Sequence, residues 1–500
     1  MPERDPRRVI VISTDRSLAP AMALLGRVEP APVVLGVFTD GRPPAPSPKL
    51  GTLDEFDAAR IGRLKTKITC AVVSLPTDPN KIRSQILELL REAEVGVVEI
   101  PAAEDLFSRV GVPSNRHAAL GKPVDLASLI GRDPHEIDRD AVGQILRGRR
   151  VLITGAGGSI GSELARACAG FAPERLILME RSENALFEID RQLERRHPGV
   201  SRRALLHDVT NESWTRRYLR DVRPHVVFHA AAHKHVPLME EHPADAVRNN
   251  VLGTRSIADA SIESGVERFV LISSDKAVHP SSIMGATKRL AELTAQAMHS
   301  RDATRFSIVR FGNVLGSAGS VIPIWSAQLA EGGPITITDP RMTRYFMTIP
   351  EAAMLVLQAS AFDPQTRAPV YVLDMADPVQ ILDLAKRFVR SHGFEPWVSP
   401  PGSGIEALGT SRTEHQIRIV ISGIRPGEKL HESLAYGSET LGPTPHVGIR
   451  SWVGSEALVD TNAMIAELRR ACAVGDREVI LGAIHQHVSL KHAVPALRAG

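Results

Sequence analysis

The sequence predicts an α/β protein with two doubly wound parallel sheets, a smaller one followed by a larger one. Short apolar runs alternate with amphipathic stretches along most of the chain, and a glycine-rich turn directly follows one of these runs near residue 155. Strands that alternate with helices form parallel sheets covered by helices on both faces. With 500 residues the chain exceeds one ordinary core, so we expect at least two domains.

Composition excludes several classes of protein. Hydrophobic residues make up 43% and charged residues 23% of the chain, as in an ordinary globular protein. The net charge of +3 and the 4% of aromatic residues do not indicate nucleic acid or an anionic membrane surface as a partner. No run approaches the ~18 apolar residues of a membrane span. The three cysteines lie far apart, which favours a reducing compartment and predicts no disulfide or metal site. We therefore expect a cytoplasmic protein without an integral membrane segment.

Residues 1–130 are predicted to form a Rossmann-like domain. Its first turn, residues 13–17, contains no glycine, so a phosphate cannot easily approach the backbone there. We interpret this turn as a degenerate phosphate loop, with an unusual ligand site as the alternative. A helix is expected over residues 81–93. The predicted strands are Arg8–Ser13, Val33–Phe38, Cys70–Leu75 and Gly96–Ile100.

The remaining chain is divided into three parts by composition and pattern. Residues 131–148 are a connector that ends in a helix over 138–146, and residues 149–440 are the main domain. Residues 441–500 are predicted to be a helical extension, with helices over 461–472 and 478–487, which serves as a cap or a subunit contact.

The main domain begins with a strand, a glycine-rich turn and a helix. The strand covers 149–153, the helix covers 162–169, and three glycines between them have the spacing TGxxGxxG. Glycine permits a tight turn, close approach of the backbone to a pyrophosphate, and close packing of the helix on the strand. A glycine-rich turn without a ligand is the alternative. The predicted cofactor-binding residues of this turn are Gly155, Gly157, Gly158, Ser159, Ile160 and Gly161.

The next strands supply further predicted cofactor contacts. Glu180 ends the second strand, where a carboxylate accepts hydrogen bonds from both ribose hydroxyls of NAD and repels the 2′-phosphate of NADP. Arg181 could receive that phosphate, so NAD is expected and NADP remains possible. Asn249 and Asn250 follow the fourth strand and either cap a helix or hold a backbone kink. The other predicted cofactor residues are Asp208 and Val209 beside the adenine, and Ala230, Ala231 and Ala232 beside the nicotinamide ribose.

A later strand, residues 269–272, ends in Ser273-Ser274-Asp275-Lys276. The spacing of Met284 and Lys288 resembles the YxxxK pair of short-chain dehydrogenases, in which the tyrosine moves a proton. A thioether cannot do so, whereas Lys288 can still bind the nicotinamide ribose. General acid–base help must then come from another group, and Asp275 and Lys276 are the nearest candidates. A solvated surface turn is the alternative for this pair.

At this point the chain resembles a known family. The segments SSDKAVHPSSIMGATKR, HAAAHKHVPLMEEHP, RFGNVLGSAGSVIP, MTRYFMTIPEAA and RPGEKLHE are similar to the CapD/WbpM-like group of nucleoside-diphosphate-sugar 4,6-dehydratases. This group belongs to the extended short-chain dehydrogenases/reductases. The resemblance covers roughly residues 136–436, and the N-terminal domain is similar to the first Rossmann-like domain of long members.

The resemblance implies a substrate, a reaction and roles for individual residues. The substrate is UDP-N-acetylglucosamine, and methionine in place of tyrosine marks a subgroup of the family. Hydride leaves sugar C4, the C5 proton is removed, the C6 hydroxyl departs as water, and the hydride returns to C6. Asp275 is implied as the acid on the departing hydroxyl, Lys276 as a neutral base at C5, and Ser274 as a ligand of the C4 oxygen. The implied substrate-binding residues are His233, Lys234, Pro237, Glu240, Asn313, Ser317, Ser320, Val321, Arg344, Arg425 and Glu428.

Two other functions remain open. A nucleotide-sugar 4-epimerase oxidises C4 and returns the hydride to the opposite face, but it would leave Asp275 and Lys276 without a clear task. A non-catalytic dinucleotide-binding regulator is suggested by Met284 and by the glycine-free N-terminal turn. We expect a homo-oligomer in each case.

Overall fold

The computed structural model divides into two compact units, Met1–Ala118 and Ala119–Gly500, and each is described by itself. The predicted phosphate-loop residues 15–16 and the connector positions 132–133 lie outside the described residues. The predicted boundaries at 130, 148 and 440 remain predictions. The described residues are 8–14, 17–18, 21–22, 25, 32–39, 48–64, 67–75, 82–100, 126–131, 134–299, 304–363, 368–400, 416–437, 439–453 and 459–490.

The first unit contains a parallel sheet of five strands in the order β3-β2-β1-β4-β5. Alternate residues of β1 enter different cores: Ile10 and Ile12 pack with helices α2 and α3, whereas Val9 and Val11 face the opposite core. Burial on both faces explains why the strands are continuous apolar runs. The strands are β1 Arg8–Ser13, β2 Val33–Phe38, β3 Lys49–Gly51, β4 Cys70–Ser74 and β5 Gly96–Glu99, and the helices include α2 Ala58–Leu64 and α3 Ile82–Glu92.

The second unit is built on a sheet of nine strands in the order β20-β21-β16-β11-β10-β9-β6-β7-β8. Seven of them are parallel, and β20 Thr440–Pro443 and β21 Ile449–Val453 add an antiparallel edge. Residues beyond 440 therefore contribute strands as well as helices. The parallel strands are β6 Arg150–Thr154, β7 Arg175–Glu180, β8 Arg202–Leu206, β9 Val226–His229, β10 Arg268–Ile272, β11 Arg305–Arg310 and β16 Val370–Leu373.

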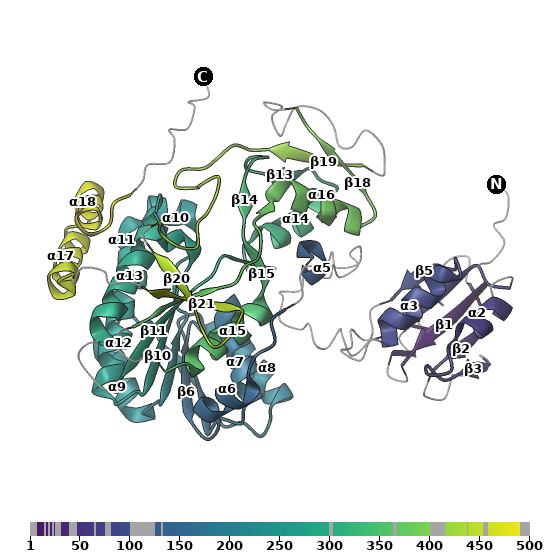
Figure 1. Ribbon diagram of the computed structural model, residues 1–500, viewed down its shortest axis with the longest axis horizontal. Coiled ribbons are helices and arrows are strands. Elements are labelled where there is room, and N and C mark those ends of the chain that lie inside the picture. Colours follow the sequence, from purple (N-terminus) through teal and green to yellow (C-terminus); the bar gives the residue numbers. More distant parts are fainter. Residues whose placement is uncertain are drawn as a thin grey trace. The chain divides into compact units, whose positions relative to one another are not determined.

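Helices cover both faces of this sheet (Figure 1), so the predicted doubly wound fold is confirmed. Val151 and Ile153 of β6 face one core and Leu152 faces the other. The first core is covered by α6 Arg139–Leu146, α7 Ser159–Ala169, α8 Glu183–Arg196 and α15 Ile349–Ala361. The second is covered by α9 Glu212–Val222, α12 Gly253–Glu263 and α13 Ile283–His299.

A smaller lobe of the second unit has its own apolar core around Trp325 and Phe388. Its helices are α5 Leu126–Ile130, α14 Val321–Ala330 and α16 Ile381–Ser391. Its strands form three short sheets: β12 Asn313–Leu315 with β15 Phe346–Thr348, β14 Thr343–Arg344 with β17 Val379–Gln380, and β13 Ile335–Ile337, β19 Gln416–Ile421 and β18 Glu395–Val398.

The C-terminal helices α17 Thr461–Val474 and α18 Arg477–His487 confirm the helices predicted there. They share an apolar core with α13, α10 Val236–Glu241 and α11 Pro243–Val247, next to the π-helix η1 Arg248–Leu252. Among the residues that the structure describes, no helix combines the length and the apolar character needed to cross a membrane.

Candidate active site

The glycine-rich turn after β6 has the geometry that its spacing predicts. Gly155 has φ of +63°, and a Cβ atom there would lie 2.8 Å from the backbone nitrogen of Ala231. A Cβ atom at Gly161 would lie 2.0 Å from the carbonyl oxygen of Gly155. Helix α7 begins at Ser159, three residues before its predicted start, so the end of the motif forms the first helical turn. The unpaired N–H groups of this turn are a suitable anion site.

Glu180 ties the end of β7 to this turn. Its Oε2 accepts a hydrogen bond from the Gly157 N–H at 3.1 Å, and its Oε1 accepts from the N–H groups of Arg181 and Ser182 at 2.9 and 3.0 Å. Most of the predicted cofactor residues come together around one cavity of about 260 Å³. The cavity is lined by Gly155, Gly157, Gly158, Met179, Glu180, Arg181, Ala185, His207, Asp208, Val209, Ala230, Ala231, Ala232 and Asn249.

Ser159, Ile160, Gly161 and Lys288 are not part of this lining. Ser159 instead accepts a hydrogen bond from the Ala318 N–H at 3.1 Å, which joins α7 to the loop before α14. Sequence reasoning missed Met179, Ala185 and His207. Their proximity to the glycine turn is a tertiary contact that no local pattern indicates.

A buried polar chain lies behind the cavity and was also missed. His229, at the end of β9, lies 2.7 Å from Thr154 Oγ1 through Nδ1 and 3.0 Å from Thr254 Oγ1 through Nε2. Burial, together with the charge of Lys288, lowers the pKa of His229 to about 3. The imidazole is therefore neutral at physiological pH, and it links β6, β9 and α12. The histidine at the end of an apolar strand was the available signal.

Asn250 uses its side-chain amide to join two other segments, so neither of the two roles expected for the asparagine pair is tested by its contacts. It lies in η1, where its Oδ1 accepts from the His233 N–H at 2.7 Å. Its Nδ2 donates to the His233 carbonyl and to Thr287 Oγ1, both at 3.0 Å. One amide thus joins the loop after β9 to helix α13. Asn249 donates to Asn250 Oδ1 at 3.1 Å.

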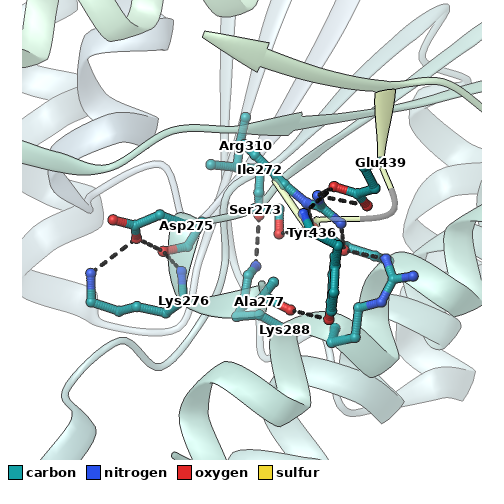
Figure 2. A network of polar contacts seen from close by, with 12 residues as sticks. Ile272, Ser273, Asp275, Lys276, Ala277, Lys288, Arg310, Tyr436 and Glu439 are labelled. Carbon is teal, nitrogen blue, oxygen red and sulfur yellow. Dashed lines mark hydrogen bonds and ion pairs between the residues drawn. The ribbon is translucent and has the colours of Figure 1, made fainter. Parts of the chain in front are cut away.

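The turn after β10 brings an acid and an amine together (Figure 2). Asp275 is fully buried, and its Oδ1 accepts hydrogen bonds from Lys276 Nζ at 3.0 Å and from Ser274 Oγ at 2.9 Å. Lys276 Nζ also donates to Asn313 Oδ1 at 3.0 Å. Among the described residues, nothing pairs with the buried Oδ2 of Asp275. Such an orphaned oxygen is costly unless a ligand or water satisfies it.

Helix α13 packs directly on this turn. A Cβ atom at Gly285 would lie 2.3 Å from the carbonyl oxygen of Lys276, so only glycine permits this approach. Met284 is buried in an apolar cluster that includes Met239 and Val251. Lys288 Nζ donates to the Ile272 carbonyl at 2.6 Å (Figure 2), and burial lowers the pKa of Lys288 to about 8.

A second cavity, of about 130 Å³, lies beside Lys276. Burial raises the pKa of Glu432 there, but the charges of Lys276, Lys429 and Arg344 outweigh it and hold that pKa low. The predicted residues Asn313, Arg344 and Glu428 line this cavity. Its complete lining is Val236, Lys276, Ser281, Ser282, Asn313, Arg344, Gly427, Glu428, Lys429 and Glu432.

Several predicted substrate residues have partners within the chain. Arg344 donates to the carbonyls of Thr343, Lys429 and Leu430 at 2.7, 2.8 and 3.1 Å, which fixes the loop that passes over it. Glu240 Oε1 accepts from the Ile283 N–H at 2.7 Å and so caps α13. Their predicted contacts with substrate remain predictions.

The other predicted substrate residues lie in loops and at the beginnings of helices, and the linings of the two cavities do not include them. Arg425 is exposed and pairs with Glu428 at 2.6 Å. Lys234 donates to the Ala318 carbonyl at 2.7 Å, and burial and the Lys276 charge lower the pKa of Lys234. Pro237 is in α10, and His233 lies in the loop before it. Ser317 is buried in the loop before α14, Ser320 precedes α14 with its Oγ unpaired among the described residues, and Val321 begins that helix.

The nine-stranded sheet, its glycine turn after β6 and the Ser-Asp-Lys turn after β10 define an extended short-chain dehydrogenase/reductase. Residues 151–451 match the model of the polysaccharide biosynthesis protein family, and the chain belongs to this family.

Individual relatives agree with this assignment. The chain is 42% identical over 377 residues to capsular polysaccharide biosynthesis protein CapD of Staphylococcus aureus, covering 75% of this chain and 59% of that one. It is 40% identical over 396 residues to probable polysaccharide biosynthesis protein EpsC of Bacillus subtilis, covering 77% and 61%. The chain thus spans about three fifths of these two relatives. The X-ray structure of Pen from Bacillus thuringiensis matches with a TM-score of 0.54 and 28% identity over 63% of this chain and 92% of that one.

Proposed function

We propose that the protein is a nucleotide-sugar 4,6-dehydratase that converts UDP-N-acetylglucosamine to its 4-keto-6-deoxy product for surface polysaccharide synthesis. One observation carries this proposal: the buried Asp275, with one oxygen unpaired among the described residues, lies 3.0 Å from Lys276, while methionine replaces the usual tyrosine. An acid and a base side by side suit an elimination, which needs one proton removed and one supplied. A UDP-N-acetylglucosamine 4,6-dehydratase (inverting) of Campylobacter jejuni, 31% identical over 58% of this chain, supports it.

The residues around the larger cavity fit a nicotinamide dinucleotide. Side chains at Gly155 or Gly161 would fill the space where the backbone must approach a pyrophosphate and where α7 must pack. The Glu180 carboxylate lines the cavity and favours NAD, because the 2′-phosphate of NADP would approach a negative charge. When bound, NAD supplies a group that takes hydride from sugar C4 and returns it to C6.

Two side chains of the turn after β10 carry the elimination. Lys276 removes the C5 proton in its neutral form, and Asp275 gives a proton to the C6 oxygen as the C6–O bond breaks and water leaves. The proton that the C4 hydroxyl loses on oxidation replaces the one given by Asp275, and Lys276 returns a proton to C5 as hydride reaches C6. Ser274 binds the C4 oxygen, and Lys288 supplies positive charge beneath the turn through its contact with the Ile272 carbonyl. Asn313 holds Lys276 in place from the lobe that would receive the sugar.

The diphosphate of the nucleotide sugar is assigned to the N-terminal end of α14. Ser317, Ser320 and Val321 lie at or just before the first turn of this helix, where unpaired N–H groups favour an anion. Arg425 is exposed and pairs with Glu428, and it offers a guanidinium fork of the type that binds phosphate.

The test is product analysis with the purified full chain and UDP-N-acetylglucosamine. We expect a product lighter by one water, and in heavy water a deuterium at C5. Asp275→Asn and Lys276→Met should each lower kcat by about 10² to 10⁴. The matched controls are Asp383→Asn and Lys386→Met, because these residues form a surface ion pair on α16. Denaturation should release NAD rather than NADP.

The competing activity is 4-epimerisation. A UDP-glucose 4-epimerase of Rickettsia rickettsii is 35% identical over 43% of this chain. Formation of UDP-N-acetylgalactosamine without a dehydrated product would replace the dehydratase proposal with this one. A wild-type chain that binds NAD but transforms no nucleotide sugar would instead favour the regulator.

A further inference from the structure

The chain between β19 and β20 crosses the backbone of the catalytic turn. Residues 427–437 and 439 of this stretch are called the bracing segment below. The Tyr436 hydroxyl donates to the Ala277 carbonyl at 2.9 Å (Figure 2). Lys429 Nζ donates to the Val278 carbonyl at 2.8 Å, and Ser281 Oγ donates to the Gly427 carbonyl at 3.1 Å. These three hydrogen bonds join the bracing segment to residues 277–281, immediately after Asp275 and Lys276.

A buried charge network anchors the bracing segment to the sheet. Glu439 accepts from Arg310 Nη1 at 2.8 and 3.1 Å, and its Oε2 also accepts from the Tyr436 N–H at 2.9 Å (Figure 2). Arg310, fully buried at the end of β11, donates to Glu292 of α13 at 2.7 and 2.8 Å. Ser273, which precedes the turn, donates to the same Glu292 at 2.7 Å. The network therefore connects both the turn after β10 and the bracing segment to β11 and α13.

The ring of Tyr436 is held on more than one side. The guanidinium carbons of Arg289 and Arg310 lie 5.4 and 5.8 Å from its centroid, within cation–π range. The His279 ring lies 4.4 Å away in an edge arrangement. Because the ring is also held by these contacts, Tyr436→Phe removes the hydrogen bond to the Ala277 carbonyl and keeps the packing.

We propose that Tyr436 is a positioning residue for Asp275 and Lys276, with Glu439 and Arg310 as its anchor. The proposal rests on the proposed function in one respect, that these two residues perform the elimination. A displaced turn moves both groups relative to the sugar, and general acid–base transfer requires hydrogen-bond distance. The lining of the dinucleotide cavity includes no residue of the bracing segment, and Tyr436 is not in the lining of the second cavity. Removing the Tyr436 hydroxyl should therefore act on kcat.

The first experiment compares Tyr436→Phe with Tyr371→Phe in the full chain. Tyr371 is a buried tyrosine of β16 whose ring centroid lies 5.3 Å from that of Phe362, which follows α15, and whose electrostatic neighbours are Arg268 and Asp363. With UDP-N-acetylglucosamine, we expect Tyr436→Phe to lower kcat about tenfold with KM unchanged, below the ~100-fold of a full ångström displacement. Tyr371→Phe should leave both constants as in the wild type. Equal constants in wild type and Tyr436→Phe would overturn the proposal, as would a rise in KM alone.

The second experiment does not depend on activity. Amide hydrogen exchange by mass spectrometry follows the peptide that covers residues 273–279, whose N–H groups of Ser273, Asp275 and Val278 bond to Val309, Phe311 and Asp275 carbonyls. Tyr436→Phe should accelerate exchange in this peptide, and Tyr371→Phe should not. Unchanged exchange would refute the positioning role even if the chain proves inactive. An inactive wild type with faster exchange in Tyr436→Phe would refute the proposed function alone.

Discussion

Replacing Glu292 by glutamine should destabilise the second unit by about 3 to 5 kcal/mol. The carboxylate is fully buried and accepts hydrogen bonds from Ser273, Arg289 and twice from Arg310. Breaking a buried ion pair by removing one partner typically costs ~3–5 kcal/mol. The pKa shift of Glu292 gives a similar figure. Burial alone would raise this pKa, but the contacts with Arg310 outweigh burial and lower it from 4.5 to about 2. This shift corresponds to about 3 kcal/mol of the free energy of unfolding at neutral pH.

The sign of the pH dependence follows from the lowered pKa. The stabilising contribution is complete above pH 4.5, where the unfolded chain is ionised, and is lost as pH falls towards about 2. Wild type and Glu292→Gln should therefore differ most at neutral pH and converge in acid. The assay is urea unfolding followed by tryptophan fluorescence, which reports only the second unit, because all the tryptophans lie there: Trp214, Trp325, Trp397 and Trp452.

The matched control is Glu267→Gln. Glu267 forms an exposed ion pair with Arg149 at 3.0 Å, and such pairs contribute at most ~1 kcal/mol. A decrease in the free energy of unfolding of less than about 1 kcal/mol for Glu292→Gln would refute the reasoning, and so would equal decreases in the two variants.

Three further predictions concern the dinucleotide and the turn. Gly161→Ala should weaken dinucleotide binding, measured by calorimetry, at least about tenfold, because the added Cβ atom would overlap the Gly155 carbonyl oxygen. Gly199→Ala is the control and should bind normally, because the space around a Cβ atom there is open. The kcat should fall above pH about 8 as Lys288 loses its charge, and a profile flat up to pH 10.5 would contradict this. Asn250→Ala leaves the His233 backbone unpaired and should lower kcat/KM about tenfold, in steady-state assays, with little change in dinucleotide binding.

Much of the fold could be predicted because its signals are local. The apolar runs became strands within a residue or two, since burial on both faces of a parallel sheet demands continuous apolar side chains. The glycine spacing placed the turn after β6 correctly, because positive φ and close backbone contact leave few alternatives to glycine. The antiparallel edge strands β20 and β21 were missed, because pairing at the edge of a sheet depends on partners far along the chain.

The site was only partly predictable for the same reason. The Ser-Asp-Lys turn and its missing tyrosine could be identified in the sequence, because strand end, turn and helix are contiguous there. The motifs predict Arg344 and Glu240 as substrate ligands, which stays a prediction, and the structure adds backbone partners that the motifs do not indicate. Contacts of this kind join residues more than 40 positions apart, so no local pattern indicates them.

The glycine turn and the acid–amine pair were thus determined by the sequence alone, because each needs only neighbouring residues. The tertiary structure decided which distant residues contact the glycine turn and the acid–amine pair. Arg310 and Glu439 are 129 positions apart and meet only because β11 and the bracing segment converge beside α13. The unpaired oxygen of Asp275 likewise exists only after folding excludes water from it. Burial and long-range pairing are properties of the packed chain, so no pattern of adjacent residues could indicate them.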